Sequence, residues 1–102
     1  MKIQEILNES EETIQTYLII YGFDLSWFIK TSASAITQYE RNPNHLMKEA
    51  LRSALFELDM RLMNIINSDV WERFGADPDV DQVYTKFTDL IEANQQYLKG
   101  LK

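Results

Sequence analysis

His45 is the only histidine of the 102-residue chain, so any histidine base or histidine metal ligand would have to be this residue. A catalytic histidine needs a converging partner, and a di-iron helical bundle needs a Glu-x-x-His pair on each of two helices. Asn42 occupies the position three residues before His45, where such a pair would need its glutamate. We therefore expect His45 to be a solvated or capping residue rather than a catalytic one.

Three alternating aspartates, Asp77, Asp79 and Asp81, match the opening of a calcium-binding loop. The rest of that loop is missing, because Gln82 stands where the loop needs glycine and Thr88 where it needs a bidentate glutamate. We interpret the three aspartates as favourable charges at a helix N-terminus and as an acidic patch that could receive a basic partner. The sequence predicts no metal site and no cofactor.

The remaining polar residues do not indicate an enzyme. Ser32 and Ser34 lie in a run of small residues without a Gly-x-Ser-x-Gly or Ser-x-x-Lys context, a pattern that favours close helix packing. Asp89 falls opposite the apolar face of its segment, where no cleft would desolvate a carboxylate acid or base. The chain contains no cysteine and therefore no thiol nucleophile. We expect neither catalysis nor a small-molecule substrate.

The composition predicts one folded domain that works in the cytoplasm. A hydrophobic fraction of 45% with 25% charged residues is typical of a globular chain, and residues 1–102 suffice for a single core. No apolar run reaches the length of a membrane span, the N-terminus is charged, and the absence of cysteine suits a reducing compartment. The net charge of −6 argues against nucleic acid and favours a protein partner.

Glycines and prolines divide the chain into four segments with helical periodicity. These breakers are Gly22, Pro43, Gly75, Pro78 and Gly100. They delimit segments at about residues 2–21, 25–41, 42–67 and 77–101. Similar lengths and short connections favour antiparallel neighbours. The sequence predicts an all-α fold, an up-and-down four-helix bundle with a possible extra short helical turn at residues 69–74.

Capping residues mark the starts of these helices. Asp24 is the expected cap of the second helix, and either Asn42 or Asn44 can cap the third. Asp77 is expected to cap the fourth helix. Ser10 could cap a new helix if the first segment were broken there, although the apolar phase continues through it.

Residues 46–74 carry two apolar faces rather than one. The broad face has the width of a core-facing surface and consists of Met47, Ala50, Leu51, Ala54, Leu55, Leu58, Leu62, Ile65 and Ile66. The second face lies near the opposite side and consists of Phe56, Met60, Met63, Val70 and Phe74. One apolar face is enough to join a bundle, so the second needs a cover from the same chain or from another molecule.

The sequence leaves two possibilities for what covers the second apolar face. The chain can cover the second face itself, with the turn that carries Trp71 and Phe74, or with the first helix, folding over Phe56, Met60 and Met63. Alternatively, the face binds another molecule, and methionine and phenylalanine are adaptable contact residues. In that case the chain is a small acidic interaction module, such as an inhibitor, an immunity-type protein or an adaptor. The other possibility is a structural subunit that assembles with itself as a homodimer or larger oligomer.

Three further residues bear on partner binding. Trp27 points away from the apolar side of its helix, so it either packs near Gly22 or is an exposed interface anchor. Asn94 lies on the apolar stripe of the fourth helix, where a buried amide can fix helix register or oligomeric state. Arg61 has Glu57 four residues before it as a natural ion-pair partner.

Overall fold

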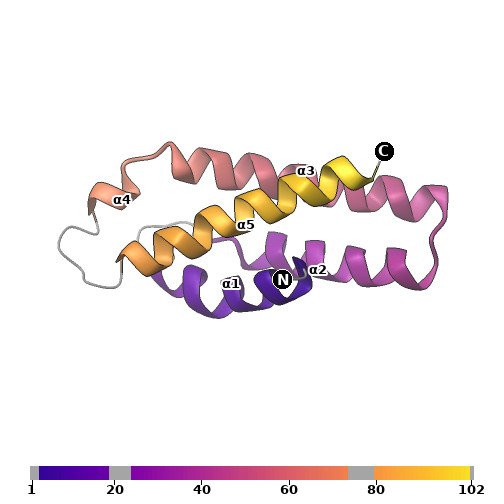
Figure 1. The fold of residues 1–102 in the computed structure, drawn as a ribbon, viewed down its shortest axis with the longest axis horizontal. Helices are drawn as coiled ribbons and strands as arrows, with labels where there is room; N and C mark the ends of the chain where they lie inside the picture. The colour runs from indigo at the N-terminus through magenta and orange to yellow at the C-terminus, as the bar shows by residue number, and fades with distance from the viewer. Residues whose placement is uncertain (1–2, 19–23, 74–79, 102) are drawn as a thin grey trace.

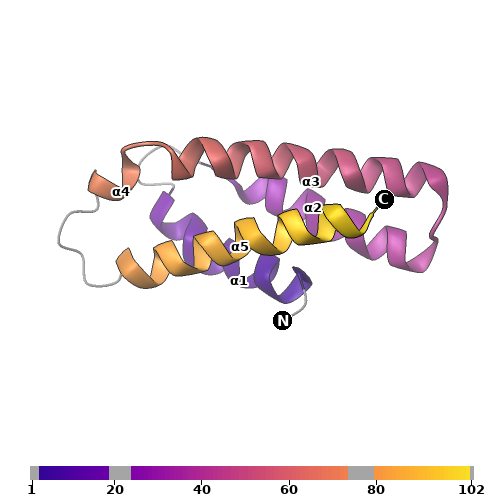
Figure 2. The ribbon, with the colours of Figure 1, turned by 45° about the horizontal axis from the view of Figure 1, so that its top comes forward.

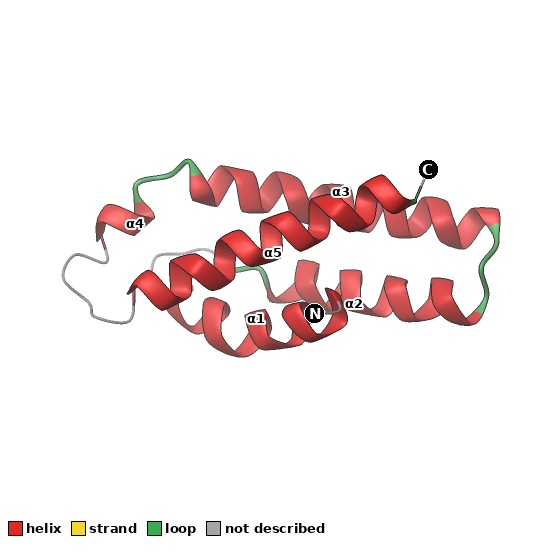
Figure 3. Cartoon of the chain, viewed as in Figure 1, coloured by secondary structure: helices red, strands yellow, loops and turns green. Residues whose placement is uncertain are grey.

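The computed structural model describes residues 3–18, 24–73 and 80–101, and all regular secondary structure in these ranges is helical (Figures 1 and 3). The helices are α1 (Ile3–Leu18), α2 (Ser26–Arg41), α3 (His45–Ile66), α4 (Val70–Arg73) and α5 (Val80–Gly100). The all-α prediction is confirmed. The short helical turn expected at residues 69–74 is present as α4.

The four long helices form the body of the molecule. Figures 1 and 2 show that α1, α2, α3 and α5 run in alternating directions along the long axis. Helix α2 packs on α1 and α3, and α5 packs on the same two helices from the other side. This arrangement is consistent with the predicted bundle, since each long helix has two neighbours and the connection between α2 and α3 is short.

The core is a continuous cluster of aliphatic side chains around Phe87. Helix α3 contributes one fully buried row, and Ile29 and Ile36 of α2 face it. That row consists of Leu51, Leu55, Leu58 and Leu62, followed by Ile65. The core face of α3 is narrower than the sequence predicts, because Ala50 is exposed at the junction with α2.

Polar side chains join neighbouring helices at three levels. The buried amide of Asn94 donates through Nδ2 to the carbonyl oxygen of Leu55 at 2.9 Å, which links α5 to α3. Gln4 donates through Nε2 to the Ala33 carbonyl at 2.8 Å, linking α1 to α2. Arg52 donates to the carbonyl of Leu101 at 3.0 Å, which holds the end of α5 against α3. Asn94 thus acts within the chain rather than toward a partner.

The helix starts agree only in part with the predicted caps. Asn44 caps α3, because its Oδ1 accepts the Met47 N–H at 2.9 Å. The prediction for α2 is wrong by one residue. Leu25 occupies the cap position with helical φ and ψ, and Asp24 accepts the Ser26 N–H at 3.0 Å from just outside it. Helix α1 is unbroken at Ser10, whose hydroxyl donates to the Ile6 carbonyl. Asp77 lies outside the described residues.

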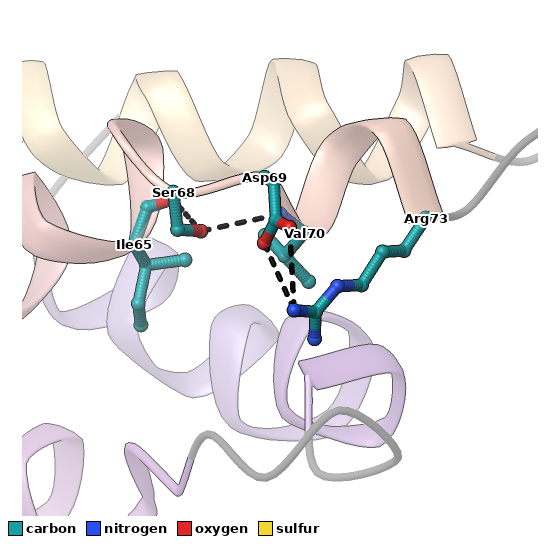
Figure 4. Close-up of polar contacts among 5 residues, drawn as sticks. All are labelled: Ile65, Ser68, Asp69, Val70 and Arg73. Atoms are coloured by element: carbon teal, nitrogen blue, oxygen red, sulfur yellow. Dashed lines mark hydrogen bonds and ion pairs between the residues drawn. The ribbon is translucent and has the colours of Figure 1, made fainter.

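A tight turn separates α3 from α4 (Figure 4). The Ser68 hydroxyl donates to the Ile65 carbonyl at 2.7 Å and accepts the Val70 N–H at 3.3 Å, so it bridges the end of one helix and the start of the next. Arg73 and Asp69 form an ion pair at 3.2 Å along α4. The turn directs Val70 into the core, where it is fully buried.

Candidate protein-interaction surface

Three large apolar side chains remain exposed on the outer side of α3. Phe56, Met60 and Met63 expose 56%, 50% and 37% of their surface, respectively. They lie within two turns of the helix, at spacings of four and three residues, so they form one continuous strip. We call Phe56, Met60 and Met63 the α3 strip.

Helix α4 does not cover the α3 strip, although the sequence allowed that arrangement. The ring of Trp71 packs edge-on against Tyr84 at 5.0 Å and against Phe87 at 5.1 Å between centroids, so α4 covers part of α5 instead. The alternative in which Trp71 folds over the strip is therefore wrong. Cover by the first helix is also wrong, because Phe56, Met60 and Met63 remain exposed while α1 packs mainly on α2 and α5. Phe74 lies outside the described residues.

One edge of the α3 strip is bordered by polar groups. Gln95 of α5 donates through Nε2 to Oδ1 of Asp59 at 3.2 Å, and the same nitrogen lies 4.0 Å from the sulfur of Met63. An apolar centre with a polar edge is the usual composition of a protein interface.

Trp27 stands at the start of α2 and exposes 66% of its surface. Its ring packs edge-on against Phe28 at 5.0 Å, and the Arg61 guanidinium of α3 lies 4.9 Å from the Phe28 ring centre. The sequence indicated Glu57 as the partner of Arg61. The contact with Phe28 joins two helices, and the spacing within one helix cannot reveal it.

A long groove runs along the outside of the junction between α2 and α3. It consists of two adjoining hollows of about 250 and 410 Å³, which share Thr31, Ala50 and Ala54 in their walls. Trp27 and Glu57 lie at one end, and Gln38 at the other. We call this feature the α2–α3 groove. The small residues Ser34 and Ala35, for which the sequence predicted close helix packing, line this groove on the surface.

A second groove, of about 750 Å³, follows the junction between α1 and α5. The described residues that line it include four carboxylates and one lysine, namely Glu9, Asp81, Asp89, Glu92 and Lys86. Of the predicted acidic patch, Asp81 is exposed in this groove, whereas Asp77 and Asp79 lie outside the described residues. The two grooves therefore differ in charge.

Groups able to do chemistry are sparse in the described part of the chain. No set of three or more histidine, aspartate or glutamate side chains there is placed to hold a metal ion, and His45 is exposed in the first turn of α3. Burial raises the pKa of the Tyr97 phenol, and the nearby Glu40 and Tyr39 add to that effect. Among the described residues, none of the helices combines the length and apolar character of a membrane span.

The surface described above thus consists of the exposed α3 strip, Trp27 and two grooves of different charge. Comparison of the chain with models of known protein families, with curated proteins and with solved structures found no match.

Proposed function

We propose that this chain is a small acidic helical module that binds a protein partner through the α3 strip and performs no catalysis. The observation that carries the proposal is the exposure of Phe56, Met60 and Met63 on a helix whose other side is fully buried. A contiguous apolar patch of this kind is costly to leave in water and is a common mark of a binding surface.

The residue types of the strip support a role in contact. Phenylalanine supplies a large rigid ring, and the unbranched methionine side chains adapt to the shape of a partner. Gln95 and Asp59 give the polar rim that a soluble interface needs. An inhibitor, an immunity-type protein or an adaptor would use such a surface. A cysteine-free composition is compatible with a cytoplasmic location for this role.

Capture experiments with matched variants test the proposal. Wild-type protein, a Phe56→Ser, Met60→Ser double variant and a Leu46→Ser control are each immobilised and exposed to lysate from the source cells. Leu46 is a suitable control because it is 75% exposed on the same helix, away from the α3 strip. We expect one protein to be retained by wild type and control but to be reduced about tenfold on the double variant, as the loss of a central contact predicts.

Two results would contradict the proposal. One is a captured set that is identical for wild type and the double variant. The other is that wild type retains nothing beyond what an unrelated immobilised protein retains. Circular dichroism of all variants shows whether they remain helical. The alternative function, self-assembly through the same strip, predicts that the double variant alone changes the mass of the protein in solution.

A further inference from the structure

The two ends of the α2–α3 groove differ in shape. At one end Trp27 projects from α2, with two thirds of its surface exposed. Toward the other end lies a hollow of about 410 Å³ whose walls include the small residues Ser34, Ala35 and Ala50, and Ala50 also borders the hollow beside Trp27. The same face therefore carries both a protruding aromatic ring and an open hollow.

A twofold axis through the middle of the groove would bring these two features together. Helices α2 and α3 run antiparallel and meet at the short connection after Arg41 (Figure 1). In an isologous pair the Trp27 end of one copy therefore faces the Gln38 end of the other.

The charges on this face also favour a second copy. Each chain carries a net charge of −6, so two copies repel one another unless they meet where carboxylates are few. The described lining of the α2–α3 groove holds one lysine, Lys30, and one glutamate, Glu57, with Arg61 at its margin over Phe28. The groove between α1 and α5 has four carboxylates against one lysine.

We propose that the α2–α3 groove is a homodimer interface, in which Trp27 of each copy enters the hollow beside Ala35 and Ala50 of the other. Twofold symmetry places two lysines and two glutamates in the contact, and their charges compensate one another. This interface uses different residues from the proposed function, because Phe56, Met60 and Met63 are not among the residues that line the groove.

Mass measurement by light scattering or sedimentation tests the dimer. We expect wild type to move from 12.0 kDa toward twice that mass as its concentration rises from about 1 to 100 µM. Trp27→Ser, and separately Ala50→Glu, which fills the hollow with a charged side chain, should weaken the dimer at least about tenfold. The Phe56→Ser, Met60→Ser variant is the matched control and should still form it.

Tryptophan fluorescence provides an independent readout of where Trp27 goes. The chain has two tryptophans, so a Trp71→Phe background leaves Trp27 as the only one. Its emission should shift to shorter wavelength over the concentration range in which the mass doubles, because the ring leaves water. Added salt, from about 0.05 to 0.5 M, should strengthen the dimer by screening the repulsion between the two acidic chains.

Three outcomes would overturn the dimer proposal. The first is that wild type stays a monomer at every concentration. The second is that a dimer forms but neither Trp27→Ser nor Ala50→Glu weakens it. The third is that the dimer is lost only when the α3 strip is changed. The last result would instead place self-assembly on the α3 strip. Cooperative unfolding of each variant shows that a lost dimer reflects the interface and not a lost fold.

Discussion

Both sides of α3 carry large apolar side chains, but the two sides lie in different surroundings. On the inner side Leu51, Leu55, Leu58 and Leu62 form a row that is fully buried against the other helices. On the outer side, the side chains of the α3 strip expose between 37% and 56% of their surface. The comparison shows that apolar periodicity identifies the residues that could be buried, whereas the positions of the neighbouring helices determine which of them are buried.

The difference follows from the number of neighbours around the helix. Helix α3 packs on α2 and α5, and α4 lies beyond its C-terminal end. The strip lies at the outer edge of the contact between α3 and α5, where Gln95 of α5 donates to Asp59 beside it. A folded chain gains about 25 cal/mol for each Å² of apolar surface removed from water, and the exposed part of the strip has not obtained that gain.

The largest expected effect separates the buried row from the strip directly. Leu58→Ala removes a fully buried side chain, and we expect a loss of about 2 to 5 kcal/mol in the free energy of unfolding. Met60→Ala removes a side chain that is half exposed and should change that free energy by about 0.5 kcal/mol or less. Urea denaturation of both variants measures the difference. Equal losses would show that the strip is covered in solution.

A second prediction contrasts two neighbouring amides of α5 that both contact α3. Asn94 is fully buried and donates to the Leu55 carbonyl, whereas Gln95 is exposed and donates to Asp59. Asn94→Ala should cost about 1 to 3 kcal/mol, because the buried bond and the packing around it are lost. Gln95→Ala should cost about 0.5 kcal/mol or less. The two variants are compared by urea unfolding, and a larger loss for Gln95→Ala would contradict the comparison.

Much of the fold follows from the sequence because its signals are local. The positions of glycine and proline separate the helices, Asn44 satisfies the first amides of α3, and the buried position of Asn94 follows from its phase on the apolar stripe. These signals depend on residues within a few turns of one another. The start of α2 was predicted one residue too early, because the Asp24 side chain accepts a backbone N–H although Leu25, and not Asp24, occupies the cap position.

The candidate surfaces could be predicted only in part, because they depend on contacts between distant segments. Periodicity identified Phe56, Met60 and Met63, but whether Trp71 covered them depended on its packing against Tyr84 and Phe87. The α2–α3 groove arises where small residues of two helices lie side by side, and a single segment carries no signal of it. The contact between Arg61 and Phe28 is of the same kind.

That contact gives a third prediction, for the side of α3 that faces α2. A guanidinium that lies over an aromatic ring near the protein surface stabilises a fold by about 0.5 to 1 kcal/mol. A double-mutant cycle with Arg61→Gln and Phe28→Leu should therefore give a coupling energy of that size, measured by urea unfolding. A cycle with Glu57→Gln in place of Phe28→Leu should give a smaller one. A larger coupling energy between Arg61 and Glu57 than between Arg61 and Phe28 would mean that Arg61 pairs with Glu57 in solution.

The smallest expected effect concerns Tyr97 of α5, whose burial is intermediate between that of the buried row and that of the exposed strip of α3. Burial, helped by Glu40 and Tyr39, raises the pKa of its phenol above the ordinary value of 10.0. The folded protein thus holds this proton more tightly than the unfolded chain, so the stability that depends on it is complete below about pH 10 and declines as pH rises through the folded pKa. Tyr97→Phe removes the ionising group, and its unfolding free energy should fall less than that of wild type between about pH 9 and 11.

Tyr84→Phe, which removes an exposed phenol of the same helix, should follow the wild-type decline. If Tyr97→Phe follows it as well, the Tyr97 phenol is accessible to water in the folded state, and the buried region around α5 ends before this residue.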